Sequence, residues 1–187
     1  MPLLKEDRYT LADALTWDKR ERIELIDGAP VMMAPPLRLH QEIITALLAQ
    51  LYNYLEGKKC KVYPAPFAVR LFERAEDVDT MVGPDLSVVC DPGKLDDIGC
   101  KGAPDLIIEV LSPSTQCHDR LTKYNLYERA GVPEYWIVSP EERTVQVSTL
   151  VDGRYRVQEL YTAEAVAKVN TLSGCFIELS KVFPAEQ

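Results

Sequence analysis

Two apolar, strand-like segments separated by one helical stretch limit the folds open to this chain more than any other feature. The first segment covers residues 106–111 and the second covers residues 134–138. Between them, residues 112–130 have helical character, and Gly131 supplies a stop signal at the end. A strand–helix–strand crossover of this kind predicts an α/β fold in which a helix packs on a sheet.

The remaining elements complete a central mixed β-sheet flanked by helices. Asp27 and Gly28 lie between two β-rich runs near the N-terminus, a signature of a β-hairpin. Apolar residues recur every three to four positions across residues 39–56, which predicts the longest helix. We expect a short first helix at residues 10–17 and further strands at residues 60–63, 67–72 and 83–90. The weakly alternating tail predicts a C-terminal β appendage at residues 144–150, 154–161 and 175–179.

Composition limits the domain count and the function classes. At roughly 150 residues per domain, 187 residues predict a single domain spanning residues 1–187. The 21 Lys and Arg residues against 29 Asp and Glu residues leave a net charge of −8. This balance argues against a basic protein that coats nucleic acid, but it leaves open an enzyme with an acidic metal site. Motifs of P-loop proteins, dinucleotide-binding proteins and hydrolases with a nucleophile elbow are absent from the sequence.

Cysteine usage and the N-terminus predict a reduced, cytoplasmic protein. The five cysteines are odd in number and include no Cys-x-x-Cys pair, so we expect core or surface thiols. The first residues lack the apolar segment of a signal peptide, and no run of about 18 apolar residues predicts a membrane span.

Glu109 is the most unusual residue, because it interrupts the apolar run Leu-Ile-Ile-Glu-Val-Leu. An ionised carboxylate without a partner is costly to bury. One interpretation is an ion pair with a buried Arg or Lys. The other involves Asp85, which opens a similar strand 24 positions earlier and could meet Glu109 at one edge of the sheet. Two such carboxylates suit Mg²⁺ or Mn²⁺.

Lys123 lies in the helical stretch that directly follows the Glu109 strand. Its spacing also fits an exposed lysine paired with Asp119 one turn earlier. A crossover helix packs on the sheet, however, so one of its faces can reach the strand ends. An ammonium group there could orient a nucleophilic water or stabilise charge on a phosphate. Tyr127, on the same helix, is expected to serve in packing.

Several segments together resemble the Uma-type family of restriction endonucleases, which belongs to the PD-(D/E)XK nuclease superfamily. They are Pro84-Asp85, the segment IIEVLSPST containing Glu109, the segment DRLTKY containing Lys123, the segment ELIDG at residues 24–28, and His40 at the start of the long helix. The resemblance covers roughly residues 10–150 and implies a restriction-endonuclease-like fold.

The resemblance also implies roles for individual residues. The superfamily pattern is an Asp on one strand and Glu-x-Lys on the next, but this chain has Leu111 at the lysine position. Families of this type are thought to recruit the lysine from the following helix, where Lys123 lies. By the same resemblance Glu24 completes the metal environment, the main-chain carbonyl of Val110 is a further metal ligand, and His40 contacts phosphate or acts as an auxiliary base. Without the resemblance, Glu24 would be an exposed strand residue, and His40 a helix cap or a surface residue.

These inferences converge on a Mg²⁺-dependent or Mn²⁺-dependent endonuclease that hydrolyses phosphodiester bonds of DNA. Catalysis would rest on Asp85, Glu109 and Lys123, assisted by Glu24 and His40. An acidic chain needs a basic rim to bind DNA. Either a dimer builds this rim, or it consists of residues within one chain, for which the candidates are Arg38, Lys58, Lys59, Lys61 and Arg70. A homodimer is expected, since cutting two strands takes two sites. Two alternatives remain: a non-catalytic binding or regulatory module, and a hydrolase of another phosphoester.

Overall fold

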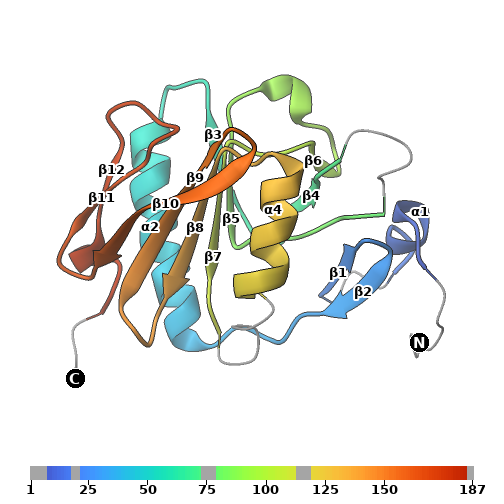
Figure 1. The fold of residues 1–187 in the computed structure, drawn as a ribbon, viewed down its shortest axis with the longest axis horizontal. Coiled ribbons are helices and arrows are strands. Elements are labelled where there is room, and N and C mark those ends of the chain that lie inside the picture. The colour runs from blue at the N-terminus through green and yellow to red at the C-terminus, as the bar shows by residue number, and fades with distance from the viewer. Residues whose placement is uncertain (1–7, 18–21, 73–78, 113–118, 185–187) are drawn as a thin grey trace.

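A six-stranded mixed sheet forms the centre of the computed structural model, which describes residues 8–17, 22–72, 79–112 and 119–184 (Figure 1). Its strand order is β10-β9-β8-β7-β5-β3, with β7 and β8 parallel and the other neighbours antiparallel. The strands are β3 (Lys61–Pro64), β5 (Leu86–Val89), β7 (Leu106–Val110), β8 (Glu134–Ser139), β9 (Thr144–Val151) and β10 (Arg154–Thr162). The predicted α/β class with a central mixed sheet is confirmed.

The predicted crossover connects the parallel strands β7 and β8. A π-helical turn, Asp119–Lys123, leads into α4 (Tyr124–Ala130). Gly131 ends α4 in the left-handed conformation, with φ of 80°, as expected for a glycine after a helix. The predicted start of this helix at residue 112 cannot be compared, since residues 113–118 lie outside the described ranges.

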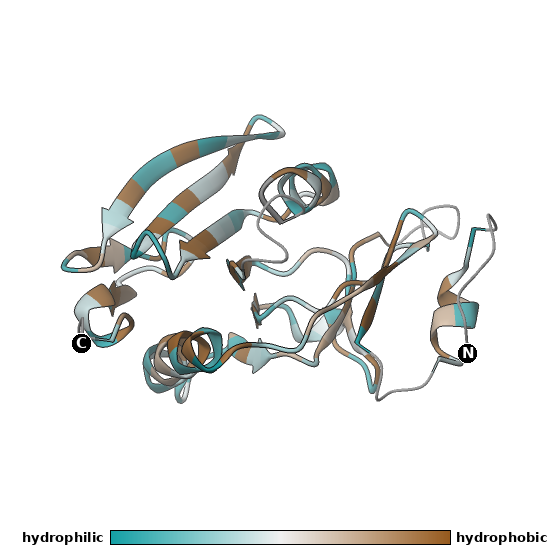
Figure 2. Cartoon of the chain, turned by 90° about the horizontal axis from the view of Figure 1, so that it is seen from below, coloured by the Kyte–Doolittle hydropathy of each residue, from teal (hydrophilic) through white to brown (hydrophobic). Residues whose placement is uncertain are grey.

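Helices cover both faces of the sheet. The 18-residue helix α2 (Arg38–Leu55) packs on one face and α4 on the other, and Figure 2 views both nearly end-on. Successive strand residues point to opposite faces. Accordingly Ile108 and Val110 join the core beneath α2, whereas Ile107 joins the core beneath α4. Glu109 has the parity of Ile107 and therefore faces the α4 side.

The N-terminal elements lie beyond one end of this sheet (Figure 1). Thr10 caps α1 (Leu11–Ala14) in a reciprocal capping box with Asp13. The predicted hairpin consists of β1 (Ile23–Ile26) and β2 (Ala29–Met32), and Asp27 and Gly28 both have positive φ, as a tight hairpin turn requires. A second small sheet pairs β4 (Ala68–Arg70) with β6 (Gly99–Lys101), and a 3₁₀ turn covers Pro92–Lys94.

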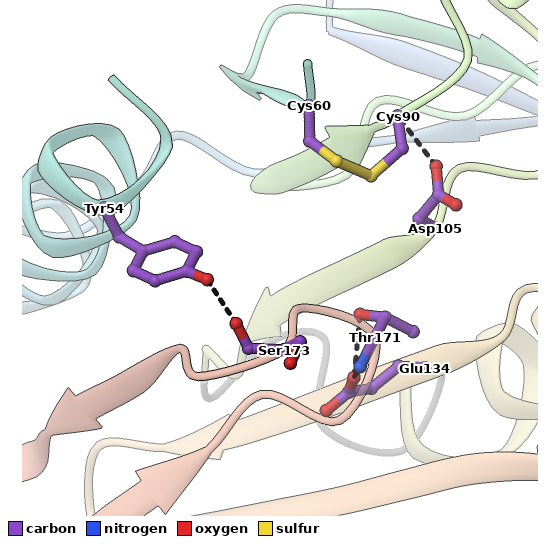
Figure 3. The surroundings of a disulfide bond; sticks show 7 residues. All are labelled: Tyr54, Cys60, Cys90, Asp105, Glu134, Thr171 and Ser173. Carbon is purple, nitrogen blue, oxygen red and sulfur yellow. Dashed lines mark hydrogen bonds between the residues drawn. A yellow bond between two sulfur atoms is a disulfide. The ribbon is translucent and has the colours of Figure 1, made fainter. Parts of the chain in front are cut away.

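The C-terminal strands differ from the expected appendage. β9 and β10 continue the central sheet, while β11 (Val166–Lys168) and β12 (Phe176–Glu178) form a separate two-stranded sheet before a 3₁₀ turn at Leu179–Lys181. The buried Glu134 carboxylate attaches this tail to β8. It accepts hydrogen bonds from the Trp136 indole and from the Asn170 backbone and side chain. It also accepts hydrogen bonds from the Thr171 backbone and hydroxyl (Figure 3).

The expectation that all five cysteines are thiols is wrong. Cys60 and Cys90 form a disulfide between the ends of β3 and β5 (Figure 3). The register that pairs Lys61 with Val89 places these flanking cysteines opposite each other. Because they are 30 residues apart in sequence, this pairing could not be predicted from their spacing. Cys100 and Cys175 are free, and burial raises the pKa of each thiol to about 11. Among the described residues, no helix is both long and apolar enough to cross a membrane.

Candidate active site

Three of the predicted residues form one buried ion cluster. The Lys123 ammonium Nζ lies 2.8 Å from Glu109 Oε1 and 3.0 Å from Glu24 Oε1. Its side chain is 0% exposed, and both carboxylate side chains are 4% exposed. The cluster joins the end of the π turn to β7 and β1. Lys123 is therefore not the exposed helix lysine that its spacing with Asp119 allowed, and Glu24 is not an exposed hairpin residue.

Tyr127 is a fourth member of the cluster that sequence analysis assigned to packing alone. Its hydroxyl donates a hydrogen bond of 2.7 Å to Glu109 Oε1. Complete burial, followed by the nearby charges of Glu109 and Glu24, raises the pKa of Tyr127 well above its usual value, so the hydroxyl keeps its proton and remains a donor. Tyr127 follows Lys123 by four residues, and this helical spacing was the signal that could have identified it.

Asp85 lies next to Glu109 because of the antiparallel register between β5 and β7. Leu86 pairs with Ile108, so Asp85 is one step further along, opposite Glu109. Asp85 Oδ2 accepts a hydrogen bond of 2.9 Å from the Val110 backbone N–H. This contact fixes the carboxylate at the end of the Glu109 strand, where Asp85 and Glu109 were expected to meet.

His40 reaches the same carboxylate from the first turn of α2. Its Nε2 lies 3.2 Å from Asp85 Oδ2, and its side chain is 10% exposed. The other ring nitrogen, Nδ1, is buried and has no hydrogen-bond partner among the described residues. Glu24 is linked to this region as well, because its Oε1 accepts a hydrogen bond of 3.0 Å from the backbone N–H of Gly83, two residues before Asp85.

A small pocket of about 30 Å³ opens between these groups. Asp85, Glu109, Val110 and His40 line it, together with Arg22 and other residues. The structure thus brings all the predicted site residues together. Asp85, Glu109, Val110 and His40 line the pocket, while Lys123 contacts Glu109 and is itself contacted by Glu24.

The oxygen atoms that line this pocket suit a hard cation that takes its remaining ligands from water and substrate. Among the described residues, no three His, Cys, Asp or Glu side chains form a cluster able to hold a metal ion. Mg²⁺ is, however, usually held by one or two carboxylates together with water and substrate phosphates. Asp85, Glu109 and the Val110 carbonyl offer such a set. Nearby, Glu24 Oε2 is buried and lacks a hydrogen-bond partner within the described part of the chain.

The expected basic rim does not surround this pocket. Arg38 lies near the site, in the first turn of α2, but it pairs with Glu42. Arg70 is buried and its guanidinium lies 2.6 Å from Asp96. Because the 18 residues of α2 span about 27 Å, the remaining candidates fall beyond the far end of the helix: Lys58, Lys59 and Lys61.

Comparison with known proteins places the chain in a family. A family model with the description "Putative restriction endonuclease", named Uma2, matches residues 11–180. The chain belongs to the Uma2 family. It is also 30% identical over 141 residues to an uncharacterized protein of Synechocystis sp., an alignment that covers 74% of this chain and 70% of that protein.

A crystal structure described as "a putative nuclease belonging to DUF820", from Anabaena variabilis, has the same fold as this Uma2 protein. The two superpose with a TM-score of 0.72 at 20% sequence identity, covering 93% of this chain and 97% of the other. At this identity the match concerns the fold, and it confirms the restriction-endonuclease-like architecture. Family and fold together support a nuclease.

Proposed function

We propose that this Uma2 protein is a metal-dependent endonuclease that hydrolyses phosphodiester bonds of DNA at the pocket between Asp85 and Glu109. One observation carries the proposal: Lys123, from the helix after β7, lies 2.8 Å from Glu109 although position 111 of the Glu-x-Lys pattern is a leucine. An ammonium supplied from another element therefore contacts the central carboxylate, as the predicted nuclease site requires.

The roles of the residues follow from their contacts. Asp85, Glu109 and the Val110 carbonyl would hold Mg²⁺ or Mn²⁺, and the bound ion would lower the pKa of a water molecule for attack on the phosphate. Lys123 acts mainly through Glu109, whose position it fixes and whose charge it balances. Tyr127 holds the same oxygen. His40 contacts Asp85 and lines the pocket, where it would contact phosphate or serve as an auxiliary base.

Glu24 supports both halves of the site. Its Oε1 contacts Lys123 and also accepts the Gly83 N–H, so it ties the lysine to the segment that carries Asp85. We assign it a positioning role, with its buried second oxygen available to the metal environment. A homodimer would supply the two sites that cleavage of both DNA strands needs.

A non-catalytic module with the same fold is the second candidate. It is favoured by the burial of Glu109, whose Oε1 is already engaged by Lys123 and Tyr127, and by the small volume of the pocket, about 30 Å³. In that case the carboxylates serve the ion cluster alone.

Calorimetric titration of Mn²⁺ and Mg²⁺ into the protein separates the two candidates, because metal binding requires no knowledge of the substrate. We expect saturable binding to the wild type and its loss in Glu109→Gln. Glu159→Gln, which changes an exposed carboxylate on β10, is the matched control and should bind like the wild type.

Cleavage assays with single-stranded DNA, double-stranded DNA, RNA and a simple phosphodiester then define the substrate class. Metal-dependent DNA cleavage by the wild type and Glu159→Gln, but not by Glu109→Gln, is the expected result. Cleavage of the simple ester alone would indicate a hydrolase of another phosphoester. If none of these substrates is cleaved, with or without metal, the non-catalytic module is favoured over the nuclease.

A further inference from the structure

A second, larger cavity lies beside the candidate active site. Its volume is about 410 Å³, within the usual range for small-molecule sites. Its walls come from the end of the α1 segment, from the start of β1, from residues 65–68 and from residues 81–83. Aromatic and aliphatic side chains predominate, among them Trp17, Phe67 and Met81.

The cavity adjoins the active-site pocket, because two residues line both. Arg22 and Met33 line both, and Glu24 lines the cavity while it holds Lys123. Arg22 therefore stands between the carboxylates and the apolar walls. The Arg22 guanidinium makes no hydrogen bond or ion pair with any residue that the structure describes, so it is available to an anion.

The arrangement matches the two parts of a nucleotide. A phosphate next to Arg22 would lie at the edge of the carboxylate pocket, where the reaction is proposed to occur. The attached base would then enter the apolar cavity, whose aromatic walls suit a planar ring. Phe67 already stacks on Tyr63, with ring centroids 4.3 Å apart and planes 9° apart, so an aromatic ring lies in this wall in a defined orientation.

The charge of the molecule gives a reason for such a site. The protein carries a net charge of −8, and the basic residues expected to form a rim lie elsewhere or are paired. Contacts with the phosphate backbone therefore contribute less affinity than in a basic nuclease. Base stacking is independent of net charge and can supply affinity that backbone contacts do not.

We propose that the 410 Å³ cavity binds the base of an unpaired nucleotide that flanks the scissile phosphate, and that Arg22 binds the adjacent phosphate. The proposal rests on the proposed function, since it takes nucleic acid as the substrate. It assigns a preference for single-stranded or locally opened DNA, because a base within a duplex would have to leave its stack to enter.

Tryptophan fluorescence in EDTA tests the proposal without cleavage. The chain has two tryptophans: Trp17 lines the cavity, and Trp136 is completely buried in the core. A single-stranded DNA oligonucleotide should quench Trp17 and bind about tenfold more tightly than an abasic strand with the same number of phosphates, a ratio equivalent to about 1.4 kcal/mol. A duplex of the same sequence should bind more weakly than the single strand.

Two variants separate the parts of the site. Trp17→Phe should abolish the fluorescence change while the preference for bases, measured by fluorescence anisotropy of a labelled strand, persists. Arg22→Gln should weaken binding of the normal and abasic strands by the same factor. Arg156→Gln, at an exposed position on β10, is the control and should bind like the wild type.

The outcomes distinguish this inference from the proposed function. Equal affinity for normal and abasic strands, or no binding of either, overturns the cavity as a base site even where metal-dependent cleavage is observed. Base-dependent binding with quenching of Trp17 supports it even where no metal binds and no cleavage occurs.

Discussion

Removal of the Lys123 ammonium is expected to destabilise the protein strongly. The substitution Lys123→Met retains the length and apolar stem of the side chain but leaves Glu24 and Glu109 buried without their cation. At an effective dielectric of about 20, a pair of unit charges 2.8 Å apart attracts by roughly 6 kcal/mol, and the cluster has a second contact at 3.0 Å. Most of this attraction offsets the cost of desolvating the charges, so the expected net loss is about 3–5 kcal/mol, as for other buried pairs that lose one partner.

Urea denaturation followed by circular dichroism measures this loss in unfolding free energy. Lys181→Met is the matched control: Lys181 also contacts a glutamate at 2.8 Å, but its side chain is 63% exposed, so the change should stay within about 0.5 kcal/mol. Combining Lys123→Met with Glu24→Gln should cost less than the sum of the single changes, with a coupling of about 1 kcal/mol or more. A loss below about 1 kcal/mol for Lys123→Met, or strictly additive changes, would refute a buried and mutually dependent ion cluster.

Three further changes probe one contact at the site and two tertiary links elsewhere in the fold. Tyr127→Phe removes a hydrogen bond to a charged carboxylate and should lower the unfolding free energy by about 1.5–3 kcal/mol; an unchanged urea midpoint would mean that Glu109 does not depend on this hydroxyl. Glu134→Ala removes the acceptor of the Asn170 and Thr171 N–H groups, so it should destabilise the protein and expose the region around residue 170 to limited proteolysis. An unaltered cleavage pattern would contradict that anchoring role. Reduction of the Cys60–Cys90 disulfide, which closes a loop of about 30 residues, should cost about 3–4 kcal/mol, and thiol titration of the unfolded, unreduced protein should find three thiols among five cysteines. A count of five would show that the bond is absent.

Local patterns were sufficient to predict most elements of the fold. The Asp27-Gly28 turn and the period of α2 each depend on residues close in sequence, and each is found where expected. Long-range pairing was harder to predict. The strands at residues 144–151 and 154–162 alternate only weakly, and only their pairing with β8 shows that they extend the central sheet. The disulfide likewise depends on the register between two strands that are distant in sequence.

The sequence predicted which residues form most of the candidate site, but not the contacts between them. Asp85 and Glu109 were identified because each carboxylate belongs to an apolar segment, and burying a charge without a partner costs free energy. The sequence did not show that Glu24 bonds both Lys123 and Gly83, or that Tyr127 donates to Glu109. The four-residue spacing from Lys123 places Tyr127 on the same helical face, but a tyrosine there fits apolar packing equally well, so the spacing alone does not identify the partner of its hydroxyl.

The structure shows how Lys123 reaches Glu109 although position 111 is a leucine. Residues 109 and 111 of an extended strand point to the same face, so a lysine at position 111 would lie on the side of Glu109. Here Leu111 occupies that place and packs in the core beneath α4 with Leu126 and Tyr127. Lys123 enters the same space from the helix, at the end of a π turn that shifts the side chains following it. In this chain an ammonium lies on the α4 side of Glu109, and the crossover helix supplies it because that helix packs directly over this face.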